Sequence, residues 1–419
     1  MKIIATSDWH LGNMFHGNDR LPEHRHFLDW LLHQLSEHKP DALLVAGDIF
    51  DNGNPSAAAQ TEYYRFFADA TQTCPGMRII ITAGNHDSAS RLEAPRPMLS
   101  RHNVEIRGNV RRVWVQEDSG SGSLQIALDD LIIPVGDFLT VLAVPYLRSD
   151  VLRNADYSEG VNEFMRRLTD RAAGLYPGRR IVMMAHMYAS GAEIAGKDAS
   201  EKIIIGGLEQ VNMQGWTSHP DYLTCGHIHK RQHIWNTEWA RYTGSILPMS
   251  FAEKDYTHGI DLITIDRDGP VSVELLEYHP QHRLRLLPEN DEMMSASKLK
   301  KLIAKELPDR NEEGLLDENF DYVMLKVCMD KVNNDMIKEI EACVSEKNAV
   351  LCKIQKIMPG IDMTTLDGGG KMTCIDDIVN RDPLETLTET FRLQADKEMN
   401  ERQKALLTQM IEAAASYEN

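Results

Sequence analysis

The stretch at residues 41–51, DALLVAGDIFD, constrains the fold of this chain more than any other part of the sequence. Its apolar run at residues 42–46 is typical of a strand in a sheet that is covered on both faces. Gly47 ends the run, so Asp48 follows the carboxyl end of the strand, where open α/β sheets bind their ligands. A carboxylate has two oxygens, and Asp48 can therefore bridge two cations. We expect an α/β sheet with Asp48 at its functional edge.

Strand and helix patterns alternate around this stretch. Apolar runs at 2–6 and 77–83 predict strands, and apolar residues at helical spacing predict helices over about 26–38 and 57–71. This β-α-β-α-β order predicts a parallel sheet with right-handed crossovers. The segments at 12–25 and 91–147 are less regular. Further predictions are strands at 110–115, 124–127, 139–144, 180–185, 222–225, 241–243, 259–266 and 271–278, and a helix at 158–175.

Side chains that bind metals follow five of the predicted strands. In extended backbone, residues i and i+2 share a face, so Asp8 and His10 can bind the same ion. Carboxylate, amide and imidazole ligands together suit Mn²⁺, Fe²⁺ or Zn²⁺ better than Mg²⁺ or Ca²⁺, which prefer oxygen ligands. With Asp48 shared, we expect one ion at Asp8, His10, Asp48 and His229, and the other at Asp48, Asn85, His186 and His227.

This set of ligands predicts phosphoester chemistry. Two divalent ions ~3.5–4 Å apart activate water and clamp a phosphoryl group for in-line displacement. His86 adjoins a predicted ligand and is well placed to protonate the leaving oxygen. Asp51, close to Asp48 in sequence, can orient the ring of His86. A single Asp-x-His or His-x-His pair is more often a surface or core pair, so the hypothesis depends on five clusters occurring together.

The charge balance argues against a generic nucleic-acid binder. The 419-residue chain carries a formal net charge of −18, whereas binding to phosphate backbones depends on Lys and Arg. A nucleic-acid substrate would need local basic patches or a more basic partner subunit. The candidate DNA contacts are Arg20, Arg25, Arg101, Arg107, Arg111, Arg112, Lys230 and Arg231.

The remaining composition, 42% hydrophobic and 26% charged, is that of an ordinary globular protein. No apolar run approaches the ~20 residues that a membrane-spanning helix needs. The N-terminus does not resemble a secretory signal, and the six scattered cysteines contain no C-x-x-C pair. We therefore expect reduced thiols, no membrane association and a cytoplasmic location.

The pattern changes after about residue 281. Helices at 297–306 and 334–346 and strands at 321–329 and 349–358 predict a small two-layer α/β unit. Residues 359–371 are typical of a linker, since they include three consecutive glycines. Residues 372–419 predict two or three short helices, whose apolar faces either pack back on the body or dock on a partner.

The blocks DWH, GDIFD, GNHD, AHM and GHIH, in this order, resemble the calcineurin-like metallophosphoesterase superfamily, and within it the nuclease subunits of bacterial nuclease–ATPase complexes. The resemblance is most specific over residues 1–251. It implies an α/β fold, with a metallophosphoesterase β-sandwich flanked by helices over residues 1–280. It also implies a small two-layer α/β capping domain over 281–358, a linker at 359–371 and a helical tail at 372–419 that binds the ATPase.

The same resemblance implies an Mn²⁺-dependent nuclease that acts in DNA repair, recombination and replication. Such an enzyme is a 3′–5′ exonuclease on duplex ends and an endonuclease on single strands and hairpins. The implied partners are an SMC-family ATPase, in a heterotetramer with two copies of each subunit, and a second nuclease domain in a homodimer. The ATPase would supply the basic surface that this acidic chain lacks.

Two alternatives remain open. A small-molecule phosphodiesterase of the same superfamily would suit the acidic charge, and a binding scaffold on a metal-free version of the fold is the other. Superfamily phosphomonoesterases often carry an arginine directly after the second aspartate of the GD-x-x-D block, whereas Asn52 follows Asp51 here. The missing arginine favours a phosphodiester substrate.

Overall fold

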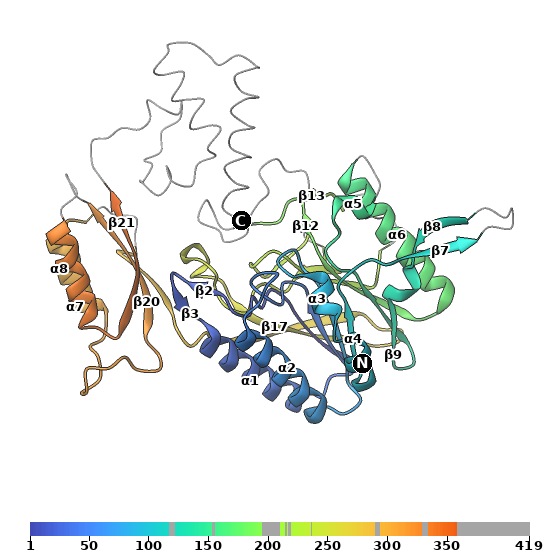
Figure 1. The fold of residues 1–419 in the computed structure, drawn as a ribbon, viewed down its shortest axis with the longest axis horizontal. Helices are drawn as coiled ribbons and strands as arrows, with labels where there is room; N and C mark the ends of the chain where they lie inside the picture. The colour runs from blue at the N-terminus through green and yellow to red at the C-terminus, as the bar shows by residue number, and fades with distance from the viewer. Residues whose placement is uncertain are drawn as a thin grey trace, which may run out of the picture. The chain divides into compact units, whose positions relative to one another are not determined.

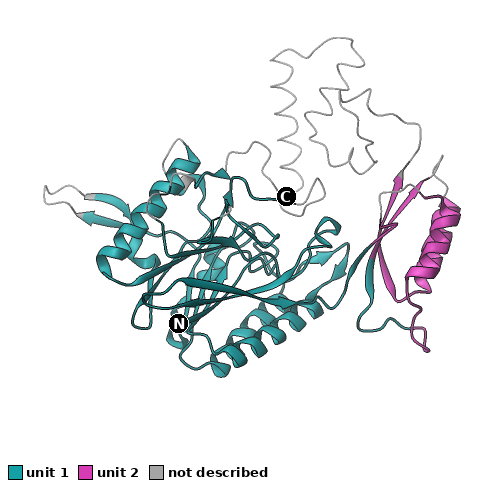
Figure 2. Cartoon of the chain, turned by 180° about the vertical axis from the view of Figure 1, so that it is seen from behind, with its two compact units in different colours: residues 1–285, 315–322 teal, residues 286–314, 323–419 magenta. Residues whose placement is uncertain are grey.

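The computed structural model describes residues 1–116, 122–152, 156–194, 210–213, 216, 219–235, 237–289, 294–328 and 334–357. They form two compact units (Figure 2). The larger unit contains residues 1–285 and 315–322, and the smaller unit contains the described residues of 286–314 and 323–357. The predicted linker at 359–371 and tail at 372–419 lie outside the described residues. Within the described ranges, no helix is long and apolar enough to cross a membrane.

The first sheet of the larger unit is built around the strand that precedes Asp48. Its strands, in spatial order, are β18 (Val271–Tyr278), β17 (His258–Ile265), β1 (Lys2–Thr6), β4 (Ala42–Ala46), β5 (Arg78–Thr82) and β6 (Val104–Arg107). The strands β1, β4, β5 and β6 are parallel, as predicted. β17 pairs antiparallel with β1, and β18 with β17.

The second sheet also has a parallel centre. Its strands, in spatial order, are β15 (Gln232–His233), β16 (Ala240–Tyr242), β14 (Tyr222–Gly226), β11 (Arg180–His186), β10 (Leu139–Ala143) and β9 (Ile132–Val135). The four central strands are parallel, and β9 and β15 are antiparallel edge strands.

The two sheets pack face to face, with helices on their outer faces (Figure 1). Side chains alternate between the two faces of a strand. In β1, Ile4 packs in the core under α1 (Leu21–His38) and α2 (Ala57–Thr73), whereas Ile3 packs between the sheets with Val141 and Met184. α6 (Tyr157–Leu175) covers the second sheet. The expected β-sandwich flanked by helices is therefore confirmed.

Helix α1 begins earlier than predicted, at Leu21 instead of about residue 26. Pro22 lies in its first turn, a position that proline tolerates, and Glu23 and His24 are buried there. Because buried polar residues hide the apolar period, the sequence pattern missed this turn.

The segment at 91–147 also contains β6 and β9, which are too short to show a period of two.

The larger unit has further short elements. These are β2 (Met14–Phe15), β3 (Asn18–Asp19), α3 (Ala89–Glu93), α4 (Arg96–Leu99), β7 (Arg112–Gln116), β8 (Gly122–Ile126), α5 (Ser149–Leu152), β12 (Tyr188–Ala189), β13 (Gln210–Val211), and 3₁₀ turns at Ser100–His102, Leu128–Leu131 and Phe251–Glu253.

A three-stranded sheet and two helices make up the small α/β arrangement near the end of the described chain. The sheet has the order β19 (Leu284–Leu287), β20 (Asp321–Cys328) and β21 (Ala349–Ile357). The helices are α7 (Ala296–Glu306) and α8 (Asn334–Ser345). Leu299 of α7, Ile340 of α8 and Leu325 of β20 share one buried cluster, so helices and sheet form two layers, as the sequence pattern predicts.

Candidate metal centre

Every predicted metal ligand lies at or just after the carboxyl end of a parallel strand. The ligand positions are Asp8 and His10 (after β1), Asp48 (after β4), Asn85 (after β5), His186 (in β11), and His227 and His229 (after β14). β1, β4 and β5 belong to the first sheet, and β11 and β14 to the second. The candidate centre therefore draws on both sheets, at the edge where ligands of α/β sheets bind.

Four of these residues have a left-handed backbone, with φ of 51° at Asp8, 47° at His10, 49° at Asp48 and 99° at His227. Residues other than glycine rarely adopt this conformation, which costs of order 1–3 kcal/mol each and clusters at functional sites. Backbone hydrogen bonds hold it in place, because the His10 N–H donates to the Asp48 carbonyl (3.0 Å) and the Asp8 N–H to the Gly47 carbonyl (3.1 Å). Such clustering of left-handed residues is typical of functional sites and agrees with a candidate site at these loop turns.

Three of the predicted ligands converge tightly. The Asn85 Oδ1 lies 3.0 Å from the His186 Nε2 and 2.9 Å from the His227 Nδ1. His186 also hydrogen-bonds through Nδ1 to the Ala46 carbonyl (2.9 Å), which fixes its ring. Together these three side chains form one half of the predicted centre.

Asp48 lies between this half and the other. Its Oδ2 is 3.4 Å from the His186 Nε2 and 3.8 Å from the His10 Nε2, and its Oδ1 accepts the backbone N–H of His86 (2.9 Å). Three groups of side chains bring their ligand atoms within 4.8 Å of one another, namely Asp8–His10–His229, His10–Asp48–His86 and Asp8–Asp48–His186. This geometry suits the predicted bridging role of Asp48.

The His10 ring shows that the cluster fits a cation. Both of its ring nitrogens are buried, and neither has a hydrogen-bond partner. Such an unsatisfied polar atom costs about 1–3 kcal/mol. Burial holds the pKa of His10 well below its ordinary value and lowers the pKa of His227 to about 3. Both rings are therefore neutral and carry a lone pair for a metal ion.

His186 and Asp48 form a coupled pair. Burial alone would lower the pKa of His186, but the neighbouring Asp48 carboxylate raises it to about 9. Burial would likewise raise the pKa of Asp48, but His186 and His10 hold it below its ordinary value. The carboxylate is thus ionised, and positive charge at this position stabilises it.

The buried carboxylate of Asp87 ties two of the ligand loops together. It accepts the backbone N–H groups of Gly84 (2.9 Å), Ile49 (3.1 Å) and Phe50 (3.0 Å). Burial, followed by the nearby Asp48 charge, raises the pKa of Asp87 to about 6. This role was not predicted from the sequence, although Asp87 directly follows the residues GNH.

Gly84 shows how closely these loops approach each other. A Cβ at this position would lie 2.0 Å from the Asp48 Oδ1 and 2.3 Å from its backbone nitrogen. A larger residue would therefore displace the carboxylate, which explains the glycine in this block.

His86 lies in the site, but its contact with Asp51 differs from the prediction. The His86 Nδ1 is 2.8 Å from the backbone carbonyl of Asp51. The Asp51 carboxylate instead accepts from Asn13 (2.8 Å) and lies 3.7 Å from the His10 Nδ1. The His86 ring is therefore fixed by a backbone group, because the loop after Asp48 turns the Asp51 carbonyl toward the residues that follow β5.

Arg20 and Arg107 do not have the exposure expected of DNA contacts. The Arg20 side chain is fully buried and forms a bidentate pair with Glu23. Arg107 is 6% exposed and bonds to Glu105. The prediction of a DNA contact is therefore wrong for Arg20. Its guanidinium also donates to the carbonyl of Pro248, which lies 228 residues further along the chain.

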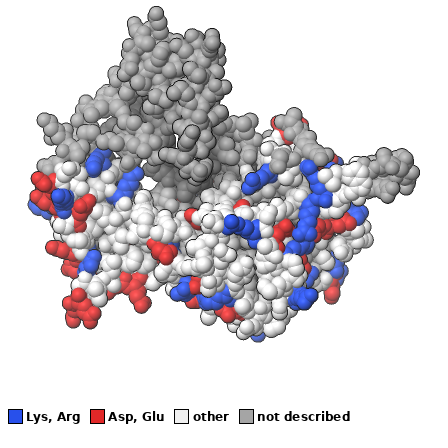
Figure 3. All heavy atoms as spheres, viewed as in Figure 1, with Lys and Arg blue, Asp and Glu red and all other residues white. Residues whose placement is uncertain are grey.

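Other candidate cations are more exposed but lie beside carboxylates. Arg25 pairs with Glu62, and Lys230 pairs with Glu193. Arg111 is 3.7 Å from both Glu93 and Asp130. Figure 3 likewise shows Lys and Arg interspersed with Asp and Glu on the visible face of the larger unit.

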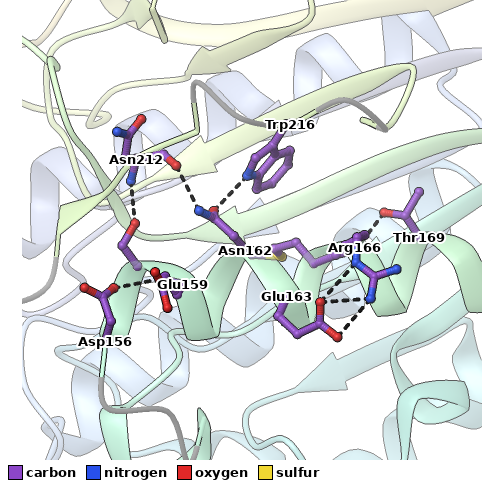
Figure 4. A pocket seen from close by; sticks show the side chains of 10 residues that line it. Asp156, Glu159, Asn162, Glu163, Arg166, Thr169, Asn212 and Trp216 are labelled. Atoms are coloured by element: carbon purple, nitrogen blue, oxygen red, sulfur yellow. Dashed lines mark hydrogen bonds and ion pairs between the residues drawn. The ribbon is translucent and has the colours of Figure 1, made fainter.

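A hollow of about 640 Å³ lies along α6 (Figure 4). Its polar side chains contact one another: the Asn162 amide donates to the Asn212 carbonyl (2.9 Å) and accepts from Trp216 (2.8 Å). None of the described residues that line it belongs to the metal-type groups. It is therefore separate from the candidate centre.

Comparison with known proteins identifies related sequences. The sequence pattern of the family described as calcineurin-like phosphoesterase matches residues 1–231. The SbcD subunit of the SbcCD nuclease from Escherichia coli (strain K12) is 32% identical over 292 residues, which cover 66% of this chain and 68% of that protein. The SbcD subunit from Rhodobacter capsulatus is 36% identical, over 63% of this chain and 66% of that protein. The SbcD subunit from Bacillus subtilis (strain 168) is 28% identical, with the same two coverages.

Proposed function

Because this chain belongs to the calcineurin-like phosphoesterase family, we propose that it is a metal-dependent phosphodiesterase that cleaves DNA as the nuclease subunit of an SbcCD-type complex. One observation carries the proposal: ligand-type side chains of both sheets converge on Asp48, whose carboxylate lies 3.4 Å from His186 and 3.8 Å from His10. The relatives that are named as SbcD subunits of the SbcCD nuclease support a nuclease within the family.

The proposed cofactor is a pair of divalent ions, most simply Mn²⁺. Mixed carboxylate, amide and imidazole ligands favour a transition ion over Mg²⁺ or Ca²⁺. When bound, such ions supply an activated water and positive charge on the phosphoryl oxygens. The residues proposed to hold them are Asp8, His10, Asp48 and His229 for one ion, and Asp48, Asn85, His186 and His227 for the other.

His86 is the proposed general acid. Its Nδ1 faces the Asp51 carbonyl at 2.8 Å, so Nδ1–H donates there and fixes the ring. In the imidazolium form, the proton on Nε2 is then the one available to the leaving oxygen. The His86 backbone N–H meanwhile holds the Asp48 Oδ1 (2.9 Å), so one residue positions the bridging carboxylate and moves the proton.

The proposed substrate is a phosphodiester in DNA. Asn52 stands where a monoesterase would carry an arginine for a dianionic phosphate. We propose 3′–5′ exonuclease action on duplex ends and endonuclease action on single strands and hairpins. An SMC-family ATPase, two copies with two of this chain, would hold the DNA, because a net charge of −18 opposes phosphate binding. A homodimer of the nuclease domain would join the two halves of the assembly.

A cleavage assay tests this proposal. The chain is incubated with Mn²⁺ and a duplex labelled at either end, with and without the ATPase partner and ATP. We expect shortening from the 3′ end that EDTA abolishes and the partner stimulates. No cleavage under either condition would contradict the nuclease function.

The second candidate is a small-molecule phosphodiesterase. The observation in its favour is that Arg25, Arg111 and Lys230 each lie beside a carboxylate, which weakens their attraction for a DNA backbone. Turnover of a cyclic nucleotide by the isolated chain, with duplex and single-stranded DNA left intact, would support this candidate over the nuclease.

A further inference from the structure

Glu253 is a buried carboxylate beside a predicted metal ligand. Its side chain is fully buried, and its Oε1 lies 3.4 Å from the His229 Nδ1. The Oε2 accepts the backbone N–H of Met249 (2.8 Å), and the Oε1 accepts the Ser250 hydroxyl (3.2 Å). These hydrogen bonds fix the carboxylate in a position where it can accept a hydrogen bond from the imidazole N–H.

The segment that carries Glu253 also supports a second ligand. The Thr243 and Ser7 hydroxyls are 2.7 Å apart, and Ser7 donates to the Asp8 carboxylate. The Ser245 N–H donates to the His229 carbonyl (3.0 Å). Residues 243–253 therefore contact His229 directly and Asp8 through the Ser7 hydroxyl. Asp8 and His229 belong with His10 to one group of metal-type side chains.

Burying a carboxylate is costly unless hydrogen bonds and a partner offset the loss of water. In metal sites, a histidine ligand commonly donates its second ring N–H to a carboxylate, which sets the tautomer and raises the basicity of the ligating nitrogen. His186 has a different support, since its Nδ1 faces the Ala46 carbonyl (2.9 Å). The Nδ1 of His229 thus faces a carboxylate, whereas the Nδ1 of His186 faces a neutral backbone carbonyl.

We propose that Glu253 is a positioning residue of the metal centre. Its carboxylate accepts Nδ1–H of His229, so that Nε2 presents its lone pair to the ion that Asp8 and His10 hold. This inference rests on the proposed function and assigns a residue outside the predicted ligand set. Glu253 acts through His229 and itself contacts neither the ion nor the substrate.

Metal titration of the full chain tests the proposal. Mn²⁺ binding is measured by calorimetry and by electron paramagnetic resonance for the wild type, Glu253→Ala and Glu253→Gln. We expect Glu253→Ala to bind one of its two ions roughly 10- to 100-fold more weakly, which is the usual effect of losing such a partner. Glu253→Gln keeps a side-chain oxygen as acceptor and should recover part of this loss. Nitrogen-15 NMR of His229 should show the Nδ1–H tautomer in the wild type and Gln variants and a mixture in the Ala variant.

The matched controls are Glu62→Ala and Glu62→Gln, because Glu62 of α2 is also buried but pairs with Arg25 of α1 and Arg65 of α2. We expect these variants to bind both ions with wild-type affinity. If the Glu253 variants also bind two ions with unchanged affinity, the positioning role is wrong while the metal centre stands. A wild type that binds no Mn²⁺ would overturn both the proposed function and this inference.

Discussion

Asp48 lies between His10 and His186, and its left-handed backbone, with φ of 49°, directs the loop that holds its carboxylate there. Asp48 is 2% exposed, so the negative charge of its carboxylate depends on neighbouring positive charge for stabilisation. A pair of cations would stabilise this charge and would also satisfy the ring nitrogens of His10, which have no hydrogen-bond partner.

Removing the Asp48 carboxylate should therefore remove the metal. We expect Asp48→Ala to retain less than one equivalent of Mn²⁺ after desalting, as measured by elemental analysis, and to lose cleavage. Asp41→Ala is the control, since Asp41 is exposed at the opposite end of the same strand and should keep both ions. Two ions in Asp48→Ala would refute the bridging role.

His86 should separate chemistry from metal binding. Loss of a general acid typically slows a reaction roughly 100- to 10,000-fold. We expect His86→Ala to slow cleavage within this range while elemental analysis still finds two Mn²⁺ per chain. His33→Ala, at a side chain that is 73% exposed on α1, should leave both quantities unchanged. Metal loss in His86→Ala would instead make His86 a ligand.

His258 should give the metal-free protein a defined pH dependence. Burial lowers its pKa from 6.5 to about 4, and its Nδ1 bonds to the Ser245 carbonyl (2.8 Å). Between pH 6.5 and pH 4 the unfolded chain binds more protons at this histidine, so its contribution to stability is present above pH 6.5 and is lost as the pH falls toward 4.

The variant His258→Asn keeps an N–H donor but cannot titrate. Urea unfolding in EDTA should therefore show the wild type losing stability relative to His258→Asn by up to roughly 3 kcal/mol between pH 7 and pH 4. Parallel curves for the two proteins over this range would contradict the burial of a neutral imidazole.

At the scale of elements, the sequence predicted those helices and strands whose apolar residues repeat at a regular spacing. The buried run in β4, the alternating core residues of β1 and the helical spacing in α2 are patterns within single elements. It did not predict how the strands divide between two sheets, because pairing such as that of β1 with β17 joins residues more than 250 positions apart. The burial of Arg20 was missed for the same reason.

The strand ends themselves were predictable, because each predicted ligand lies within a few residues of the end of an apolar run. The links between them were not. Asp87 bonds to the loops after both β4 and β5, and the Asp51 carbonyl reaches His86. Such links depend on loop conformation, which a pattern of residue types does not contain.

Asp87→Asn tests the link between these two loops. An amide presents N–H groups toward some of the three backbone N–H donors that the carboxylate now satisfies, so we expect about 2–4 kcal/mol of destabilisation in urea unfolding. Metal affinity should fall as well, because the loops position Asp48 and Asn85. Asp41→Asn is the matched control, since its carboxylate accepts one backbone N–H, that of Lys2 (2.8 Å), at an exposed position. Equal stability of the two variants would contradict the proposed clamp.

At the scale of the whole molecule, the acidic charge and the candidate centre make different demands. A net charge of −18 repels a DNA backbone, whereas the cluster around Asp48 attracts cations. Bound divalent ions offset part of the local charge, and the proposed ATPase partner would supply the rest of the DNA-binding surface. Under this proposal the chain would carry the chemistry, while tight DNA binding would depend on the assembly.

The most direct test of this account is a crystal structure of the full chain saturated with Mn²⁺, with anomalous diffraction measured at the manganese edge. We expect two anomalous peaks, one on each side of the Asp48 carboxylate. The first should lie next to His10 and His229, and the second next to His186 and His227. A single peak, or none, beside Asp48 would contradict the shared carboxylate and with it the proposed two-ion phosphodiesterase.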